Sequence, residues 1–256
     1  MSKVRTVILR APGTNCDAET MFAFQQAGVV VTSVHVNQLI RGEQRLSDYQ
    51  IMVIPGGFTY GDDISAGKVL ANELRLKLGE DILKFIEDGG LILGICNGFQ
   101  VLVKAGILPR LSDGDSPLLT VAANDSGKFE CRWVYLDVNK ESPCVFTKGI
   151  ESMYLPVAHA EGKVVADPKV LPELNVVLYY ADEQGDNKAG YPYNPNGSVG
   201  NIAGICDASG RVFALMPHPE RHLRGTQHPQ WTRQGAREYG DGFQIFLNAV
   251  KWAQGL

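Results

Sequence analysis

The chain has 256 residues, of which 45% are hydrophobic and 20% are charged, and its net charge is −4. This composition argues against intrinsic disorder, and the lack of a basic surplus argues against a nucleic-acid partner. No apolar run approaches the ~20 residues of a membrane span, so we expect no membrane partner. Five cysteines without a CxxC pair argue against a disulfide framework or a zinc ribbon and favour a reduced, cytoplasmic location.

The first hundred residues alternate between strand and helix patterns. Short apolar or β-branched runs predict strands, and amphipathic segments that end near glycine predict helices. The predicted strands cover residues 4–9, 29–36, 51–54 and 91–95, and the predicted helices cover 15–28, 80–88 and 97–105. This alternation predicts an α/β fold with a mostly parallel sheet and helices on both faces.

The second half is rich in strand patterns until the C-terminus. Strands are predicted at 133–138, 176–180, 202–205 and 212–216, and the closing helix presents Phe243, Phe246, Leu247 and Val250 on one face. We expect these strands to extend the same sheet and to add antiparallel strands. No shift in composition divides the chain, so we predict a single domain over residues 1–256. Two polar segments, 184–198 and 222–240, are predicted to be surface loops, with His222 and His228 exposed to solvent.

The first candidate site is the sequence GICNG at 94–98, which joins a predicted strand to a predicted helix. A nucleophile on such a sharp turn needs small residues two positions before and after it, and Gly94 and Gly98 meet this need around Cys96. The helix N-terminus that follows favours the thiolate. A buried core cysteine is the alternative, and the flanking glycines favour the nucleophile.

The second candidate site is the sequence MPHPE at 216–220, directly after a predicted strand. Alternate residues of an extended segment point the same way, so His218 and Glu220 can lie on one side. A carboxylate beside an imidazole fixes its tautomer and stabilises the imidazolium. Together with Cys96 these residues predict a nucleophilic triad, whereas the alternative is a proline-rich loop with a surface histidine.

The third candidate is the glycine pair in PGG at 55–57, again after a predicted strand. Acyl chemistry at a thiolate needs N–H donors for the oxyanion. The N–H groups of the glycine pair and of Asn97 are the expected donors. The adjacent acids Asp62 and Asp63 are expected to be solvated, and we predict no metal.

The sharp turn at 94–98, called the elbow from here on, and the histidine–glutamate motif at 216–220 resemble those of class I, triad-type glutamine amidotransferases. Further segments narrow the resemblance to the family of glutaminase subunits of phosphoribosylformylglycinamidine synthase, from purine biosynthesis. These segments are PGGFTYGDD at 55–63, NDSGKFECRW at 124–133, PVAHAEG at 156–162, YPYNPNGS at 191–198 and MPHPER at 216–221. The resemblance covers nearly the whole chain and implies a flavodoxin-like core.

The resemblance also implies roles for individual residues. Cys96 matches the nucleophile, His218 the general base and acid, and Glu220 the orienting carboxylate. Gly57 and Asn97 match the backbone donors of the oxyanion hole. Gln100 matches a position that helps to hold the substrate amide. Asn124, Ser126 and Phe129 belong to the glutamine pocket or to a partner interface, and His159 is assigned a structural or interface role rather than a catalytic one.

The resemblance implies that this chain hydrolyses L-glutamine to glutamate and ammonia. The ammonia would pass to a separate synthetase subunit that makes formylglycinamidine ribonucleotide, together with a small accessory subunit. No phosphate-binding GxxxxGK[ST] loop occurs here, so ATP and Mg²⁺ are expected on the partner and no cofactor in this chain. Two alternatives stay open: a free-standing cysteine hydrolase of the same fold, and a non-catalytic regulatory subunit.

Overall fold

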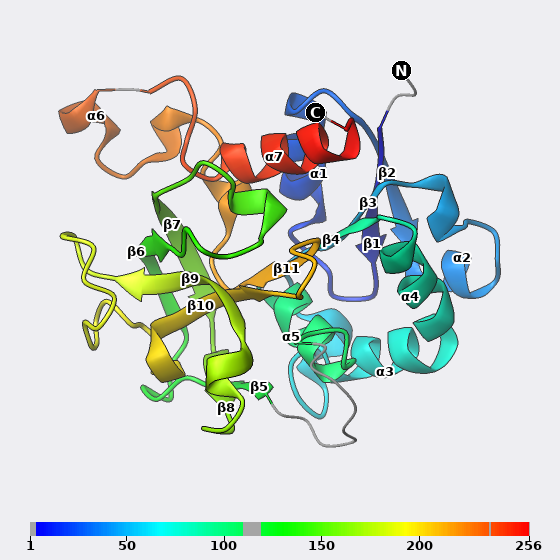
Figure 1. Cartoon of the computed structure of the whole chain (residues 1–256), viewed down its shortest axis with the longest axis horizontal. Helices are drawn as coiled ribbons and strands as arrows, with labels where there is room; N and C mark the ends of the chain where they lie inside the picture. Colours follow the sequence, from blue (N-terminus) through cyan, green and yellow to red (C-terminus); the bar gives the residue numbers. More distant parts are fainter. Residues whose placement is uncertain (1–3, 110–118, 236, 256) are drawn as a thin grey trace.

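A nine-stranded mixed sheet forms the centre of the computed structural model, which describes residues 4–109, 119–235 and 237–255 (Figure 1). The strand order is β2-β1-β3-β4-β11-β10-β9-β6-β7, and β5 and β8 form a separate two-stranded sheet. The strands are β1 Arg5–Arg10, β2 Val30–His35, β3 Ile51–Ile54, β4 Leu91–Ile95, β5 Leu119–Ala123, β6 Glu130–Val138, β7 Ser152–His159, β8 Glu161–Ala166, β9 Asn175–Ala181, β10 Ile202–Cys206 and β11 Val212–Leu215.

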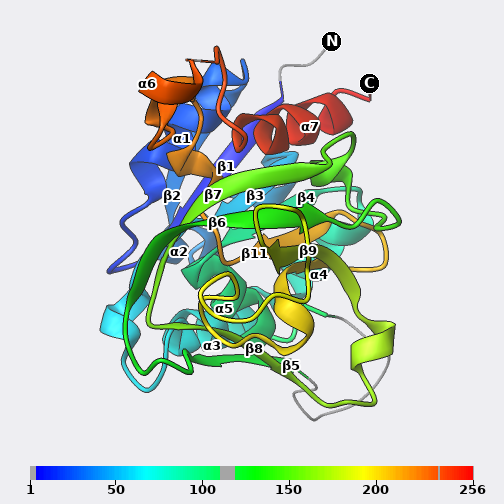
Figure 2. The ribbon, with the colours of Figure 1, turned by 90° about the vertical axis from the view of Figure 1, so that its left-hand side faces the viewer.

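Helices cover both faces of the parallel part of this sheet. The α-helices are α1 Asp17–Gln26, α2 Val36–Ile40, α3 Lys68–Lys77, α4 Gly79–Glu87, α5 Asn97–Lys104, α6 Trp231–Gln234 and α7 Phe243–Ala253. Helices α1 and α7 lie on one side of the sheet, whereas α3, α4 and α5 lie on the other (Figure 2). In the part of the chain that the structure describes, no helix is both long enough and apolar enough to cross a membrane.

The parallel part of the sheet consists of β2, β1, β3, β4 and β11. Every residue of β3, β4 and β11 is buried, because helices cover both faces of these strands, and this explains their continuous apolar runs. The amphipathic pattern of α4 likewise buries Ile82, Phe85 and Ile86 against the sheet. The predicted α/β fold with a mostly parallel sheet is confirmed.

The antiparallel part consists of β10, β9, β6 and β7. The predicted addition of antiparallel strands is therefore confirmed, although the sequence patterns predict no strand at β5, β7 or β8 and only two thirds of β6. Strand β7 buries every second residue, a pattern that its proline and histidine obscure. No α-helix occurs between β6 and β11, all of whose residues the structure describes, because antiparallel neighbours need no crossover helix.

The antiparallel part bends back toward the carboxyl end of β4. The backbone N–H of His218, beyond the end of β11, donates to the carbonyl oxygen of Pro156 in β7 at 2.8 Å. The Sγ of Cys96, at the end of β4, lies 3.8 Å from the carbonyl oxygen of Ala158 in the same strand. Strand β7 therefore closes one side of the predicted site.

The segment 184–198, predicted as a surface loop, ends inside the protein. Asn194, Asn196 and Ser198 are buried, with Asn196 fully so. The side-chain amide of Asn194 donates to the carbonyl oxygen of Ser198 at 2.9 Å, and its oxygen accepts from the backbone of the same turn. Polar residues can be buried here because they satisfy one another, so the prediction holds only for the first part of the segment.

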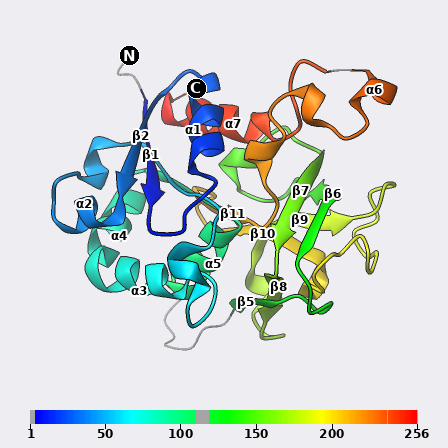
Figure 3. The ribbon, with the colours of Figure 1, turned by 180° about the vertical axis from the view of Figure 1, so that it is seen from behind.

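The segment 222–240, described except for residue 236, is also not wholly exposed. It lies with α6 beside the ends of β6 and β7 (Figure 3). The prediction of an exposed His222 is wrong, because only 2% of the residue is exposed. Its ring centroid is 5.0 Å from that of Trp133, and its Nδ1 lies 2.8 Å from the carbonyl oxygen of Tyr154.

Candidate active site

Cys96 lies at a sharp turn between β4 and α5. Its backbone has φ 51° and ψ −103°, which residues other than glycine rarely adopt. The turn is tightly packed: a Cβ on Gly94 would lie 2.6 Å from Leu102, and one on Gly98 would lie 2.0 Å from the carbonyl oxygen of Ile54. The packing therefore requires both flanking glycines, for the reason that the sequence pattern suggests.

Cys96 directly precedes the first residue of α5, so its sulfur lies at the N-terminus of that helix. The residue is 6% exposed, and its backbone N–H donates to the carbonyl oxygen of Leu215 in β11 at 2.8 Å. This bond ties the end of β4 to the end of β11, from which the second motif follows. The N-terminus of α5, which carries a partial positive charge, therefore adjoins this sulfur.

His218 and Glu220 form a buried pair beyond the end of β11. The Nδ1 of His218 lies 2.6 Å from Oε1 of Glu220, and both residues are at most 2% exposed. Because the carboxylate engages Nδ1, proton transfer falls to Nε2. Among the described residues Nε2 has no hydrogen-bond partner, so it is available to a reacting group.

The charges around His218 determine its protonation state. Burial disfavours the imidazolium, but the negative charges of Glu220 and Cys96 outweigh this effect and hold the pKa of His218 well above its usual range. These charges therefore favour the imidazolium over the neutral ring. An imidazolium next to a thiolate supplies both a nucleophile and a proton donor.

The turn after β3 brings the predicted glycine pair to the same place. The carbonyl oxygen of Gly56 accepts hydrogen bonds from the N–H groups of Asn15 at 3.3 Å and Cys16 at 3.1 Å. In a trans peptide the N–H points opposite to the carbonyl, so the N–H of Gly57 points away from this anchor. A Cβ on Gly56 would lie 2.8 Å from the ring of His218. The turn therefore adjoins the triad, and oxyanion binding by Gly57 stays a prediction.

Asn97 and Gln100 lie on the first turn of α5, and both are buried. The Oδ1 of Asn97 accepts from the hydroxyl of Thr59 at 2.7 Å, and its Nδ2 donates to Oε1 of Gln100 at 2.9 Å. The Nε2 of Gln100 donates to the carbonyl oxygen of Glu161. These side chains therefore connect the loop after β3 and the start of β8 to the elbow.

The roles expected of Asn97 and Gln100 depend on different groups. Asn97 is expected to act through its backbone N–H, and Gln100 through its side-chain amide. The N–H of Asn97 is one of the first N–H groups of α5, which lack a partner inside the helix, and its role as an oxyanion donor stays a prediction. Contact between Gln100 and the substrate also stays a prediction, since both ends of its amide already have protein partners. Sequence reasoning missed Thr59, although it lies within the PGGFTYGDD segment.

No sequence signal marks Cys16, yet the structure places it beside the triad. Its sulfur, a nitrogen of His218 and an oxygen of Glu220 all lie within 4.8 Å of one another. Such a group could hold a metal ion, but Nη2 of Arg221 already lies 3.1 Å from the sulfur. A cation would have to displace this guanidinium and compete with the imidazole–carboxylate bond. Our expectation of no metal therefore stays a prediction.

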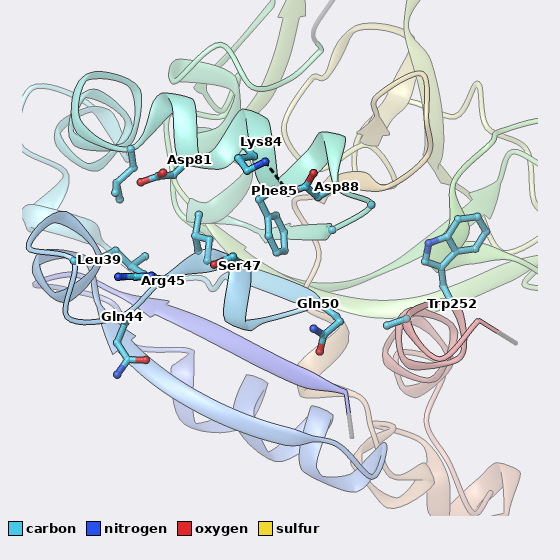
Figure 4. Close-up of a pocket in the computed structure, with 16 residues that line it drawn as sticks. Leu39, Gln44, Arg45, Ser47, Gln50, Asp81, Lys84, Phe85, Asp88 and Trp252 are labelled. Atoms are coloured by element: carbon cyan, nitrogen blue, oxygen red, sulfur yellow. Dashed lines mark ion pairs between the residues drawn. The ribbon is translucent and has the colours of Figure 1, made fainter. Parts of the chain in front are cut away.

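A separate cavity of about 610 Å³ lies away from these residues (Figure 4). Its lining includes Gln50, just before β3, Gly90, just before β4, and Phe85 and Trp252 from α4 and α7. Cys96 follows the other end of β4, so the length of that strand separates the cavity from the triad. The cavity therefore makes no contribution to the chemistry at Cys96.

The fold and the site agree with those of a glutamine amidotransferase, and the assignment of Cys96, His218 and Glu220 as its catalytic triad stays a prediction. Residues 3–253 match the family model of the CobB/CobQ-like glutamine amidotransferase domain. The chain belongs to this family, which agrees with the resemblance that its motifs indicate.

Individual relatives narrow the similarity to one kind of protein within this family. The chain is 60% identical over 255 residues to phosphoribosylformylglycinamidine synthase subunit PurQ of Dehalococcoides mccartyi, with 99% of both chains covered. It is 42% identical to the protein of the same name in Methanococcus maripaludis, with 97% of both chains covered. Among solved structures, that of PurLQS from Thermotoga maritima matches with a TM-score of 0.74 and 34% identity, over 98% of this chain and 99% of that one.

Proposed function

We propose that this chain is the glutaminase subunit of phosphoribosylformylglycinamidine synthase, which releases ammonia from L-glutamine for de novo purine biosynthesis. The observation that carries the proposal is the buried Cys96–His218–Glu220 arrangement at a strained elbow. It occurs in a chain that is similar over its full length to subunits of that enzyme.

The chemistry follows from the charges at the site. The Cys96 thiolate attacks the carboxamide carbon of glutamine, and the N–H groups of Gly57 and Asn97 stabilise the oxyanion that forms. The imidazolium of His218 gives its proton to the amide nitrogen, the C–N bond breaks, and ammonia leaves a γ-glutamyl thioester. His218 then takes a proton from water, the hydroxide attacks the thioester, and glutamate and the thiolate are released.

The fate of the ammonia defines the partners. The relative of known structure carries the name PurLQS, which supports a complex with a synthetase subunit and with a small accessory subunit. The synthetase would use the ammonia to convert formylglycinamide ribonucleotide into the amidine. ATP and Mg²⁺ belong to that subunit in this proposal, because the present chain has no phosphate-binding loop, and this chain itself needs no cofactor.

Two further expectations belong to the same proposal. A single domain over residues 1–256 is supported by the one sheet that runs from β2 to β7. A cytoplasmic location is supported by five free cysteines, one of which must stay reduced to act as the nucleophile.

The test uses the chain assembled with its synthetase and compares wild type with Cys96→Ala. We expect glutamine-dependent amidine formation to fall by on the order of 10⁴-fold or more, because the nucleophile is lost. Ammonia-dependent formation should stay at the wild-type level, because the synthetase does not use Cys96.

Two results would contradict the proposal in different ways. Glutamine-dependent synthesis that survives in Cys96→Ala would show that Cys96 is not the nucleophile. A wild-type chain that hydrolyses glutamine equally well alone and supplies no ammonia to a synthetase would instead indicate a free-standing hydrolase. A regulatory subunit would show no glutamine hydrolysis at all.

A further inference from the structure

His159, the last residue of β7, is a buried histidine that the triad chemistry does not use. It is 3% exposed, and a Cβ on Gly162 would lie within 2.3 Å of its ring, so the ring is tightly held. Its Nε2 is buried and has no hydrogen-bond partner among the described residues. A buried polar atom without a protein partner is costly, so this nitrogen is available to a hydrogen-bond donor from outside the chain.

The neighbours of His159 fix which of its nitrogens carries the proton. The Nδ2 of Asn124 donates to the carbonyl oxygens of Lys128 and His159, each at 2.9 Å. The Oδ1 of the same amide accepts from the backbone N–H of Gly162 at 3.1 Å and lies 3.1 Å from Nδ1 of His159. Because Oδ1 can only accept, Nδ1 must donate. Nε2 therefore presents a bare lone pair.

His159 also stays uncharged. Burial lowers the pKa of His159 to about 4, with a smaller contribution from the positive charge of His218. Among the residues that the structure describes, no carboxylate pairs with this ring, in contrast to that of His218. At neutral pH the side chain is thus an acceptor that cannot give up an acidic proton.

The backbone of β7 connects this acceptor to the reacting sulfur. The carbonyl oxygen of the preceding residue, Ala158, lies 3.8 Å from Sγ of Cys96. A glutamine bound to Cys96 would therefore lie against the end of β7, the strand that His159 terminates.

A polar cluster continues from His159 on the inner side of the site. The Nδ2 of Asn196 donates to the carbonyl oxygen of Gly162 at 2.8 Å and to the hydroxyl of Tyr180 at 3.1 Å. Tyr180 is fully buried, and its hydroxyl is close enough to Cys96 for the thiolate charge to raise its pKa further after burial has done so.

We propose that Nε2 of His159 binds the ammonia released at Cys96 by accepting a hydrogen bond from it. This inference rests on the proposed function, because it assumes that the site releases ammonia. Ammonia offers three N–H donors, and Nε2 offers one lone pair, so one N–H···N bond satisfies the buried atom. Nothing else in the described part of the chain occupies that lone pair.

A neutral acceptor has a chemical advantage at this point. When the thioester forms, His218 has just transferred its proton to the leaving nitrogen, and the product is neutral NH₃. Only neutral ammonia is a nucleophile toward an activated carbonyl, and a second acidic group would convert it to ammonium. His159 in its Nδ1–H form can bind ammonia without protonating it.

The test separates the two nitrogens of His159 by substitution. His159→Asn keeps a donor near Nδ1 for Asn124 but has no acceptor at Nε2. His159→Gln places its amide oxygen near Nε2 but loses the bond to Asn124. In the chain assembled with its synthetase, the amounts of glutamate and amidine formed from glutamine are measured in the same sample.

We expect the ratio of glutamate to amidine to rise by about two- to tenfold in His159→Asn, the range that one neutral hydrogen bond provides. The ratio in His159→Gln should stay near wild type, although this variant unfolds more readily. Added ammonium salt should restore amidine formation in His159→Asn. His222→Asn, at another buried histidine, is the matched control, and its ratio should equal that of wild type.

An unchanged ratio in His159→Asn would overturn the inference, and so would an equal rise in His159→Gln, which would indicate a structural role. If His159→Asn fails to assemble, His159→Leu also lacks the acceptor and carries the same expectation. The proposed function fails in a different way, since glutamate release would then survive in Cys96→Ala.

Discussion

The parallel and antiparallel parts of the sheet each bring one buried histidine toward Cys96, and the two imidazoles carry different charges. His218 follows β11 in the parallel part and contacts the carboxylate of Glu220. His159 ends β7 in the antiparallel part and contacts the neutral amide of Asn124. Both residues are at most 3% exposed. The comparison teaches that the charge of the partner, rather than burial, decides which histidine can act as an acid.

The largest expected effect comes from breaking the acid–base pair of the parallel part. His218→Ala should lower the kcat of glutamine hydrolysis in the assembled complex by on the order of 10⁶-fold, because it removes the group that moves every proton. Glu220→Gln should cost about 10⁴-fold, because the imidazole remains but loses its charge stabilisation and orientation. Steady-state kinetics of both variants under the same conditions measure the difference.

A larger loss in Glu220→Gln than in His218→Ala would mean that the two roles are assigned in the wrong order. Ammonia-dependent synthesis serves as the control in both variants, since neither residue takes part in it.

The two histidines are also expected to differ in how their contribution to the free energy of unfolding depends on pH, first at His159. Its folded-state pKa of about 4 lies below the unfolded value near 6.5, so the unfolded chain binds a proton that the folded chain excludes. The stability contributed by the neutral ring is therefore present above pH 6.5 and is lost as the pH falls toward 4. Denaturant unfolding at several pH values should show the difference between wild type and His159→Asn changing by about 3 kcal/mol over this interval.

The sign of this effect is opposite at His218. The pKa of His218 is raised, so its contribution to stability is fully present below pH 6.5 and is lost as the pH rises through the folded-state pKa. A stability difference between wild type and His159→Asn that is constant from pH 7 to 4 would contradict the neutral state assigned to that ring.

The smallest expected effect concerns the loop that the parallel part holds beside the elbow. Thr59→Val removes the hydroxyl that donates to Asn97 at 2.7 Å and leaves only a longer bond from the backbone N–H at 3.4 Å. We expect a loss of about 1–2 kcal/mol in the free energy of unfolding.

Thr6→Val is the matched control for this variant. The hydroxyl of Thr6 is equally buried, but it has no partner among the described residues. Its removal should be neutral or stabilising, since an unpaired buried hydroxyl costs free energy. Equal losses in the two variants would show that the Thr59 hydrogen bond contributes nothing specific.

The two parts of the sheet also differ in how far the sequence predicts them. Strands β3 and β4 are buried on both faces, so each is visible in the sequence as a continuous apolar run. The PGG turn follows the first run, and Cys96 follows the second. The elbow is local, because its glycines act within two residues of the nucleophile. The sequence patterns do not predict helix α3. Its N-cap residue is Gly67 rather than a polar residue, and the helix buries only Leu70, Ala71 and Leu74.

The antiparallel part depends on contacts between distant residues. Asn124 contacts His159 and Gly162, and Asn196 contacts Gly162 and Tyr180. No spacing in the sequence predicts such pairs, because they depend on strand pairing across many residues. The segment that contains Asn196 therefore reads as a polar loop, and His159 as a structural residue.

Two buried histidines at one site are expected to hold opposite protonation states. Nitrogen-15 NMR of the chain with labelled histidine, assigned with His159→Gln and His218→Gln, measures both states between pH 5.5 and 8. We expect a neutral, Nδ1-protonated His159 throughout this range and a doubly protonated His218 at pH 7. A His159 that titrates near pH 6.5, or a His218 that is neutral at pH 7, would contradict this expectation.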